Sequence, residues 1–540
     1  MAIDKKQIFE LTQDREMNLI DLKEASIWAS QYLNRKVTIS NISYLIQYGR
    51  INKYGINGHL MVDLNELKNY YDSIGKEKKM KRILGDDLNW HLSFVEYTEA
   101  ERTKHVHRLH PYKGKFIPQL VEYFLDSHTD EFKRKIYFHK GDIVLDPFCG
   151  SGTTLVQANE LGIHAIGIDI STFNTLITEV KIKNHDLKLI VKETNELTSK
   201  LSDFENTRNN LAFEQDLLAE LARFNFRYFP SPEFKKKISK GEVNEEKYGM
   251  EKEKEFLPVY YSLVEKYGLK IKQDKDDTFL GKWLLEPVRE EIDFLSGEIK
   301  KITNDDVRNV LKLILSRTVR SCRATTHADL ATLKEPVTTT YYCKKHSKIC
   351  KPIFSIKSWW EFYTKDTVKR LYEFSKLRTD TFQIALTGDS RTINIYNEIE
   401  KKEAAFAEVL LKQKIKGIFT SPPYVGLIDY HEQHAYAYEI FGFERRDDLE
   451  IGPLFKGQNE EAKGLYVKGI AEVLRNSKKY LQSDYDIFLV ANDKFNLYPK
   501  IAELANMKIV NQFKRPVLNR VEKDRDTAYS ETIFHLKEKL

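Results

Sequence analysis

The chain has 540 residues, 41% hydrophobic and 31% charged, and its 86 lysines and arginines against 80 acids give a net charge of +6. This length suffices for about two to four domains, and the composition predicts a globular, soluble chain. No apolar run reaches the roughly 18 residues of a membrane span, and the first residues lack the apolar segment of a signal peptide. Four cysteines exclude a disulfide scaffold, so we expect a cytoplasmic protein.

Residues 1–75 predict a small module of helices and one hairpin. A first helix precedes a second one, which Thr38 or Ser40 caps and Gly49 ends, and a glycine-containing hairpin follows. The pattern resembles a winged helix-turn-helix of the excisionase kind, which implies DNA contact; a packing or dimerisation module is the alternative. The charged residues 76–100 predict a linker.

Residues 101–190 alternate between strand and helix, which argues for a parallel sheet. "DIVLDPFCGSGTTLVQANELG" reads as strand, glycine turn and helix, and "IHAIGIDIS" as the next strand. Residues 191–380 are long, charged and helical, and predict a large insertion. Strand patterns return in residues 381–540, so we expect the sheet that begins near residue 143 to be completed after the insertion.

The glycine turn after the first strand predicts a ligand-binding loop. Gly150 and Gly152 allow a tight turn and a close approach of a ligand to the backbone. The stretch lacks the GK[ST] of a phosphate-binding P-loop and the third glycine of a dinucleotide site. Asp169, nineteen residues after Gly150, is placed to bind ribose hydroxyls, and a helix N-cap is its alternative role.

Residues 420–424, "TSPPY", follow the apolar run "IKGIF". Two prolines end strand pairing and stiffen the backbone, and a rigid loop at the carboxyl end of a strand is where open α/β sheets keep their sites. A simple proline turn is the competing interpretation.

Three stretches together resemble motifs of the DNA amino-methyltransferases. They are "DPFCGSGTT", similar to the family's S-adenosylmethionine motif, "TSPPY", similar to its catalytic motif, and "HRLHPYKGKFIPQLVEYF", which resembles the motif beside the methionine end of the cofactor. The resemblance implies a Rossmann-like methyltransferase core with a mixed seven-stranded sheet, in which the last strand, "ETIFHLK", is antiparallel. It also implies the α-type order, with a target-recognition insertion between the cofactor and catalytic motifs.

The resemblance assigns roles to individual residues. The implied contacts to S-adenosyl-L-methionine are Lys115, Phe116, Asp146, Phe148, Gly150, Gly152, Thr153, Asp169 and Asp389. The implied catalytic residues are Ser421, Pro422, Pro423 and Tyr424. We expect the Ser421 hydroxyl and the Pro422 carbonyl to accept hydrogen bonds from an exocyclic amine, and Tyr424 to stack on an extruded base. Asp429 and His431 are candidates for the base pocket or for solvated helix residues.

Serine at position 421 is, by resemblance, the signature of cytosine-N4 enzymes, and adenine N6 is the next candidate. An RNA or protein methyltransferase and a DNA-binding regulator with an inactive core are further alternatives. Cys149 lies in the cofactor loop, which disfavours the 5-methylcytosine chemistry of a Pro-Cys pair. The expected partners are double-stranded DNA and, in a restriction-modification or defence system, a cognate endonuclease.

Three of the four cysteines fall close together within the insertion. Cys322, Cys343, His346 and Cys350 predict a tetrahedral structural zinc site, with His327 as an alternative ligand. Buried reduced thiols are the competing interpretation.

Overall fold

The computed structural model describes residues 18–539 apart from gaps at 34–35, 48–49, 56–59, 86–87, 95–96, 98, 113, 275–276, 330–332 and 518–528. Two compact units are present: the described residues up to Arg102 with Phe513–Glu531, and Thr103–Gln512 with the residues from Thr532 onward. Within the described ranges, no helix combines the length and the apolar character needed to cross a bilayer.

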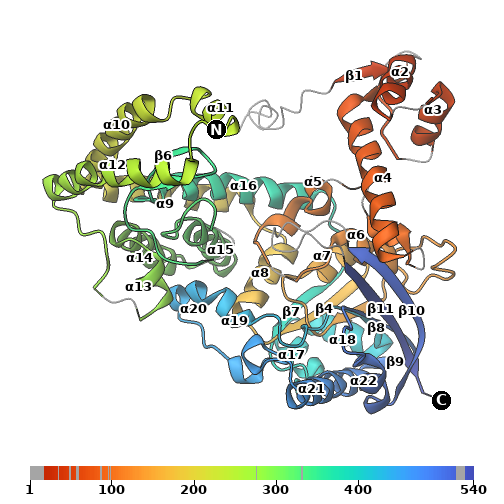
Figure 1. Ribbon diagram of the computed structural model, residues 1–540. Helices are drawn as coiled ribbons and strands as arrows, with labels where there is room; N and C mark the ends of the chain where they lie inside the picture. The colour runs from red at the N-terminus through yellow and green to blue at the C-terminus, as the bar shows by residue number, and fades with distance from the viewer. Residues whose placement is uncertain are drawn as a thin grey trace. The chain divides into compact units, whose positions relative to one another are not determined.

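A mixed seven-stranded sheet runs in the order β10-β11-β9-β8-β3-β4-β7 (Figure 1). The β9-β8-β3-β4-β7 stretch is parallel throughout, and β11 is antiparallel to β9. The strands are β3 (Ile143–Asp146), β4 (His164–Asp169), β7 (Gln383–Thr387), β8 (Ile415–Thr420), β9 (Leu481–Ala491), β10 (Met507–Val517) and β11 (Tyr529–Glu538). The expected completion of the sheet after the insertion is confirmed, as is the antiparallel last strand.

Helices cover both faces of this sheet, which is why its parallel strands read as continuous apolar runs (Figure 1). One face buries its side chains against α17 (Ile395–Lys402), α18 (Ala404–Gln413), α21 (Glu460–Lys478) and α22 (Tyr498–Leu504). The helices on the other face are α6 (Pro118–Leu125), α7 (Thr153–Glu160) and α8 (Thr172–Ile182). There Phe124 of α6 contacts Phe419 and Phe488, with ring centroids 5.5 and 4.8 Å apart.

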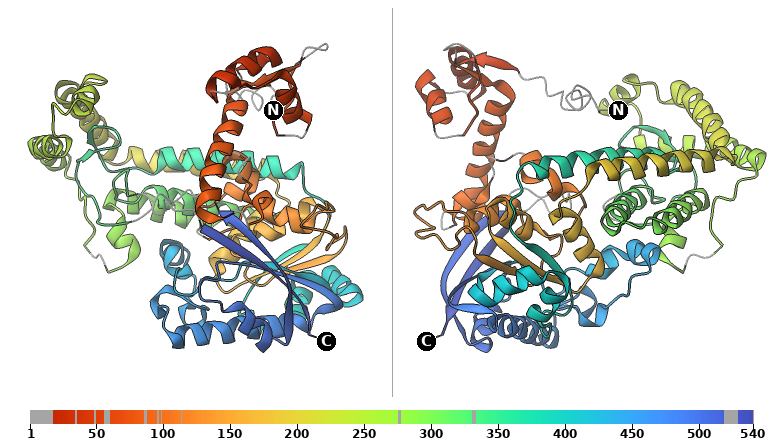
Figure 2. Two further views of the ribbon diagram at one scale, coloured as in Figure 1. Left: turned by 45° about the vertical axis from the view of Figure 1, so that its right-hand side comes forward. Right: turned by 180° about the vertical axis from the view of Figure 1, so that it is seen from behind.

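The insertion leaves the core after α8 and returns at β7. Its helices are α9 (Leu187–Asn206), α10 (Asn210–Tyr228), α11 (Glu233–Ser239), α12 (Glu245–Tyr267), α13 (Phe279–Trp283), α14 (Glu286–Lys300), α15 (Asp305–Ser321) and α16 (Lys357–Ser375). The long helices α9 and α16 lie side by side (Figure 2), and the Trp360 indole donates to Thr198 Oγ1 at 2.9 Å. A short antiparallel hairpin, β5 (Tyr341–Cys343) and β6 (Lys348–Cys350), is an element that the helical pattern did not predict.

The smaller unit contains the N-terminal module. Its elements are β1 (Leu19–Asp21), α2 (Leu22–Tyr32), α3 (Ile39–Gln47), β2 (Met61–Asp63), α4 (Leu64–Leu84), the 3₁₀ helix η2 (Trp90–Ser93) and α5 (Glu99–Arg102). Thr38 Oγ1 accepts from the Asn41 amide at 3.2 Å at the start of α3, as predicted. Helix α4 continues to Leu84, so the first part of the expected linker is helical. The helix-turn-helix identity of this module stays a prediction.

Candidate active site

A cavity that is partly open to solvent lies at the carboxyl ends of four neighbouring strands. The loop after β3 contributes Phe148 and Gly150, the end of β4 contributes Asp169, and the loops after β7 and β8 contribute Asp389 and Ser421. These strands are adjacent and parallel, so their carboxyl ends meet at one edge of the sheet. The glycine loop and the proline loop, 270 residues apart in the sequence, therefore line a single cavity.

Most of the residues predicted from the motifs line this cavity. They are Lys115, Phe116, Phe148, Gly150, Thr153, Asp169, Asp389, Ser421 and Pro423. Four predicted residues, Asp146, Gly152, Pro422 and Tyr424, are not among its lining residues. Of these four, Asp146, Gly152 and Pro422 are buried, and Tyr424 is partly buried.

Both glycines of the turn adopt positive φ, 49° at Gly150 and 75° at Gly152. A Cβ atom on Gly150 would lie 2.8 Å from the Tyr112 hydroxyl oxygen, and one on Gly152 would lie 2.6 Å from Thr178 Cγ2. The turn therefore requires glycine for its backbone conformation and for its close contacts.

Asp169 fixes the glycine loop at the end of β4. Its Oδ2 accepts from the Gly150 amide at 2.9 Å, and its Oδ1 accepts from the Ser171 amide at 2.9 Å and from Asn174 Nδ2 at 3.0 Å. Burial raises the pKa of this carboxyl above its usual range, although these hydrogen bonds oppose the rise. Ser171 is the N-cap of α8, so the alternative capping role of Asp169 is wrong.

Asp146 joins the two motif strands below the cavity. Its carboxylate accepts from Thr154 Oγ1 of α7 and from Thr420 Oγ1 at the end of β8, each at 2.6 Å, and from the Phe148 amide at 3.2 Å. The side chain is 1% exposed, and burial raises its pKa to about 6. Asp146 is not among the lining residues of the cavity, so its position does not support the predicted contact with the cofactor. Its carboxylate connects β3, α7 and β8.

Two predicted cofactor residues already have partners. Asp389 forms a bidentate ion pair with Arg391, with Nε and Nη2 each 2.7–3.0 Å from a carboxylate oxygen. The Lys115 ammonium donates to the His107 carbonyl at 2.8 Å, and burial, with Arg108 and Arg370 nearby, lowers the pKa of Lys115 to about 8.

The proline loop presents Ser421 in a fixed orientation. The Ser421 hydroxyl donates to the Val490 carbonyl of β9 at 3.1 Å, so the lone pairs of its oxygen remain available to an acceptor role. Pro422 is buried, and the partly buried Tyr424 packs against the hydrophobic core of the sheet.

Sequence reasoning missed three groups of the cavity wall, namely Tyr112, Tyr430 and Glu450. The rings of Tyr112 and Tyr430 are stacked, with centroids 6.1 Å apart, and burial raises the pKa of both, so both phenols are neutral near pH 7. Tyr112 lies within the stretch "HPYKGKF", which resembles a cofactor motif, so its place in that motif could have marked it as a cavity residue. Glu450 lies 19 residues beyond His431, with no motif around it.

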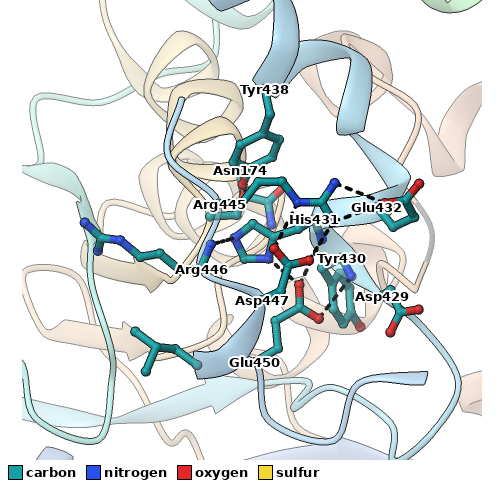
Figure 3. A network of polar contacts seen from close by, with 12 residues as sticks. Asn174, Asp429, Tyr430, His431, Glu432, Tyr438, Arg445, Arg446, Asp447 and Glu450 are labelled. Carbon is teal, nitrogen blue, oxygen red and sulfur yellow. Dashed lines mark hydrogen bonds and ion pairs between the residues drawn. The ribbon is translucent and has the colours of Figure 1, made fainter. Parts of the chain in front are cut away.

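A polar network holds the segment after the proline loop (Figure 3). This segment contains α19 (Tyr430–Gln433), α20 (Ala435–Phe441) and the 3₁₀ helices η4 (Asp447–Leu449) and η5 (Leu454–Lys456). The buried Glu450 accepts from the His431 ring at Nδ1, from the His431 amide at 2.9 Å and from the Tyr430 amide at 3.2 Å. His431 Nε2 accepts from the Arg446 amide at 3.3 Å, so Nδ1 carries the ring proton. His431 therefore supports the wall.

The charge of the cavity indicates what kind of ligand fits. Its charged lining residues within the described ranges are three acids, Asp169, Asp389 and Glu450, and one base, Lys115. An acidic lining favours a cationic ligand with hydroxyl donors and opposes a phosphate group. The sulfonium, ammonium and ribose diol of S-adenosyl-L-methionine fit such a lining; by the resemblance, Asp169 would hold the ribose and Asp389 would meet the adenine ring.

The predicted zinc ligands need one correction. Cys343, His346 and Cys350 lie together, but the fourth member of the group is His327, whereas Cys322 is absent from it. Cys322 is the residue that ends α15, where it is 1% exposed within the helical packing. Proximity in sequence suggested Cys322, and the path of the chain after α15 brings His327 to the hairpin.

Comparisons with known proteins show the family of the chain. A family profile described as DNA methylase matches residues 10–179. The chain is 47% identical over 528 residues to the type II methyltransferase M.MjaII of Methanocaldococcus jannaschii, covering 96% of this chain and 97% of that protein. Shorter matches are the type II methyltransferase M.BsoBI of Geobacillus stearothermophilus, 34% identical over 19% of each chain, and the tRNA (guanine(10)-N2)-dimethyltransferase of M. jannaschii, 39% identical over 11% of this chain and 20% of that one. The match to M.MjaII covers almost the whole of both chains. The chain therefore belongs to the N6/N4 family of DNA methylases.

Proposed function

We propose that this DNA methyltransferase transfers a methyl group from S-adenosyl-L-methionine to the exocyclic N4 amine of cytosine in duplex DNA. The observation that carries the proposal is that Ser421, the first residue of the S-P-P-Y loop, lines the same cavity as Gly150 and Asp169. Methyltransferases of this family use S-adenosyl-L-methionine, which supplies an electrophilic methyl group on a sulfonium.

The part of the cavity around Asp169 and Asp389 is proposed to bind S-adenosyl-L-methionine through hydrogen bonds and charge. Asp169 holds the Gly150 loop through the Gly150 amide, and its carboxylate oxygens keep lone pairs for ribose hydroxyls. Asp389, held flat by Arg391, presents a carboxylate edge for an amino group. Phe148 and Phe116 supply apolar walls that exclude water. The Lys115 ammonium donates to the His107 carbonyl, so its proposed role is to position its own segment of the cavity wall.

The base half of the cavity prepares the amine for attack. The lone pair of an exocyclic amine is delocalised into the ring, and hydrogen-bond acceptors on its two N–H groups favour the pyramidal nitrogen that frees this lone pair. The Ser421 oxygen, oriented by the Val490 carbonyl, is one such acceptor. The Pro422 carbonyl is our proposed second acceptor, held by the fixed φ of proline. Transfer then needs positioning and no covalent enzyme intermediate.

The target base has to leave the helix stack to reach this loop. Tyr424 is our proposed stacking surface for that base. Its position against the sheet core gives the ring a fixed support. The N-terminal module and the insertion are our proposed DNA-contacting parts, and a restriction endonuclease of the same specificity is the proposed biological partner, in line with the type II naming of the full-length relative.

Adenine N6 is the alternative target, because the family uses both amines. Serine at position 421 favours cytosine by resemblance. The test is incubation of the purified protein with methyl-labelled cofactor and with duplex DNA, tRNA or a protein mixture, followed by digestion of the labelled nucleic acid to nucleosides. We expect label in N4-methyldeoxycytidine from duplex DNA. Label in N6-methyldeoxyadenosine, in tRNA or in protein would refute the cytosine assignment.

A matched pair of serine variants tests the site itself. Ser421→Ala removes the proposed acceptor and should lower kcat by about 10- to 100-fold, the loss expected from one hydrogen bond of about 1.5–3 kcal/mol in the transition state. Ser316→Ala is the control, since the buried Ser316 hydroxyl of α15 also donates to a carbonyl, that of Leu313 at 2.7 Å, without lining the cavity. Equal rates for both variants would remove Ser421 from the mechanism.

A further inference from the structure

A cluster of two cysteines and two histidines lies in the insertion, away from the methyltransfer cavity. The hairpin β5–β6 supplies Cys343, His346 and Cys350, and the loop after α15 supplies His327. His346 Nδ1 lies 3.5 Å from Cys343 Sγ and 3.4 Å from Cys350 Sγ, and His327 Nδ1 lies 3.6 Å from Cys343 Sγ. One ligand atom from each residue lies within 4.8 Å of all the others.

These separations match the edges of a zinc tetrahedron. Zn–S bonds of about 2.3 Å and Zn–N bonds of about 2.0–2.1 Å at tetrahedral angles put sulfur and nitrogen about 3.5 Å apart. The three printed sulfur–nitrogen separations are 3.4, 3.5 and 3.6 Å. We propose that His327, Cys343, His346 and Cys350 bind one structural Zn²⁺ ion. Four protein ligands leave no open position, so the site has no catalytic role.

The hairpin needs such a clip because its own core is too small. Each strand has three residues, and the buried cluster around them consists of Tyr341, Cys343 and Cys350 with the partly buried Val337. A two-stranded hairpin of this size is at best marginally stable in water without a further constraint. The metal would join the hairpin to the loop of His327 through Cys343 and Cys350, which belong to this cluster.

The opposite side of the hairpin is held by the helices of the insertion. Asn225 of α10 pairs with both backbone groups of Ile349, each at 2.9 Å. The Tyr342 amide donates to Glu253 Oε2 of α12 at 2.8 Å. The Tyr342 ring packs on Gly249 of the same helix, where a Cβ atom would lie 2.5 Å from the ring. These contacts hold the face of the hairpin that packs on α10 and α12. The metal would hold the face that carries Cys343 and Cys350.

Tyr341 is a neighbour of the site and not one of its ligands. Its hydroxyl lies 2.8 Å from His327 Nδ1, the same nitrogen that faces Cys343. When the metal takes that nitrogen, the hydroxyl has to turn away. Binding also replaces the protons of the two thiols, which are released to solvent.

The test is the metal content of the full-length protein, measured by inductively coupled plasma mass spectrometry after dialysis against a mild chelator. We expect one zinc per chain, and Co²⁺ substitution should give the visible d–d absorption of a tetrahedral thiolate site. His327→Ala and Cys343→Ser should lose the metal and lower the Tm. Tyr341→Phe and Cys322→Ser are the controls and should retain it.

Several results would overturn the proposal. They are a wild-type protein that neither contains nor takes up zinc or Co²⁺, a Cys343→Ser variant that keeps full stoichiometry, and a Cys343–Cys350 disulfide found by mass spectrometry of the unreduced protein. Loss of the metal from Cys322→Ser with retention by His327→Ala would assign the fourth ligand to Cys322 and equally contradict the site described here. None of these measurements depends on methyltransferase activity.

Discussion

The buried carboxylate of Asp146 allows a quantitative prediction about stability and pH. Its pKa in the folded protein is about 6, compared with 3.8 for an ordinary aspartate. The folded state therefore binds the proton more tightly than the unfolded state does. Below about pH 4 both states are protonated, and as the pH rises through 6 the folded state has to carry a buried charge. The unfolding free energy should fall over this interval.

The size of the fall follows from the two pKa values. The gap between 3.8 and about 6 corresponds to roughly 3 kcal/mol, since a tenfold change in proton affinity is about 1.4 kcal/mol. Asp146→Asn keeps the shape and does not titrate. The amide oxygen of the variant can still accept from Thr420 and the Phe148 amide. Its nitrogen can donate to Thr154, whose hydroxyl then has the Phe419 carbonyl, 3.5 Å away, as its acceptor.

The assay is urea denaturation of wild type and Asp146→Asn, followed by far-UV circular dichroism at pH 4.5 and pH 7.5. All other titrating groups are common to both proteins, so their effects cancel in the difference at each pH. We expect the variant to gain roughly 2 kcal/mol relative to wild type on going from the lower to the higher pH, because the unfolded aspartate is already mostly ionised at pH 4.5 and part of the fall precedes this interval. A difference that does not change with pH, or a variant that loses stability as the pH rises, would refute the reasoning.

Three further predictions concern the cavity and the N-terminal module. Gly150→Ala should weaken cofactor binding more than tenfold in isothermal titration, because its Cβ would meet the Tyr112 ring, whereas Gly141→Ala, with φ of 86° and nothing within 4 Å, should cost only about 1 kcal/mol of stability. Tyr424→Ala should lower the rate of methyl transfer strongly at unchanged cofactor affinity, and an equal loss of both would contradict the stacking role. Deletion of residues 1–80 should weaken DNA binding in a gel-shift assay, and an insoluble product would indicate a packing role.

Local sequence patterns, namely apolar runs that end in glycine or proline, were sufficient to predict the core fold. The apolar strands before Gly150 and Ser421 are buried on both faces, so their runs were unambiguous, and the glycines and prolines that end them mark the loops of the site. The resemblance in three motifs added the number of strands in the sheet and the antiparallel last strand, but not the order of the strands. These features depend on residues that are neighbours in sequence.

Features that depend on distant contacts were not predictable in the same way. Glu450 lines the cavity and accepts hydrogen bonds from Tyr430 and His431, and no local pattern marks these pairs. His327 replaces Cys322 in the metal group because the loop after α15 folds back to the hairpin. The side chain of Asp146 points to two threonines, whereas its motif position had suggested a ligand. In each case, the sequence gives the residue type and the tertiary path decides its partner.

The departure and the return of the long insertion lie close together on the core. Residues 183–187, where the chain leaves, and residues 371–378, where it comes back, line one small hollow, and β4 and β7 on either side of this excursion pair directly. The entropic cost of closing a loop grows only slowly with its length. The stability of the β4–β7 pairing therefore depends little on how many residues are inserted between these two points. The insertion can therefore be exchanged for another one while β4 and β7 keep their register; under the proposed function, such an exchange would change the DNA sequence that is recognised.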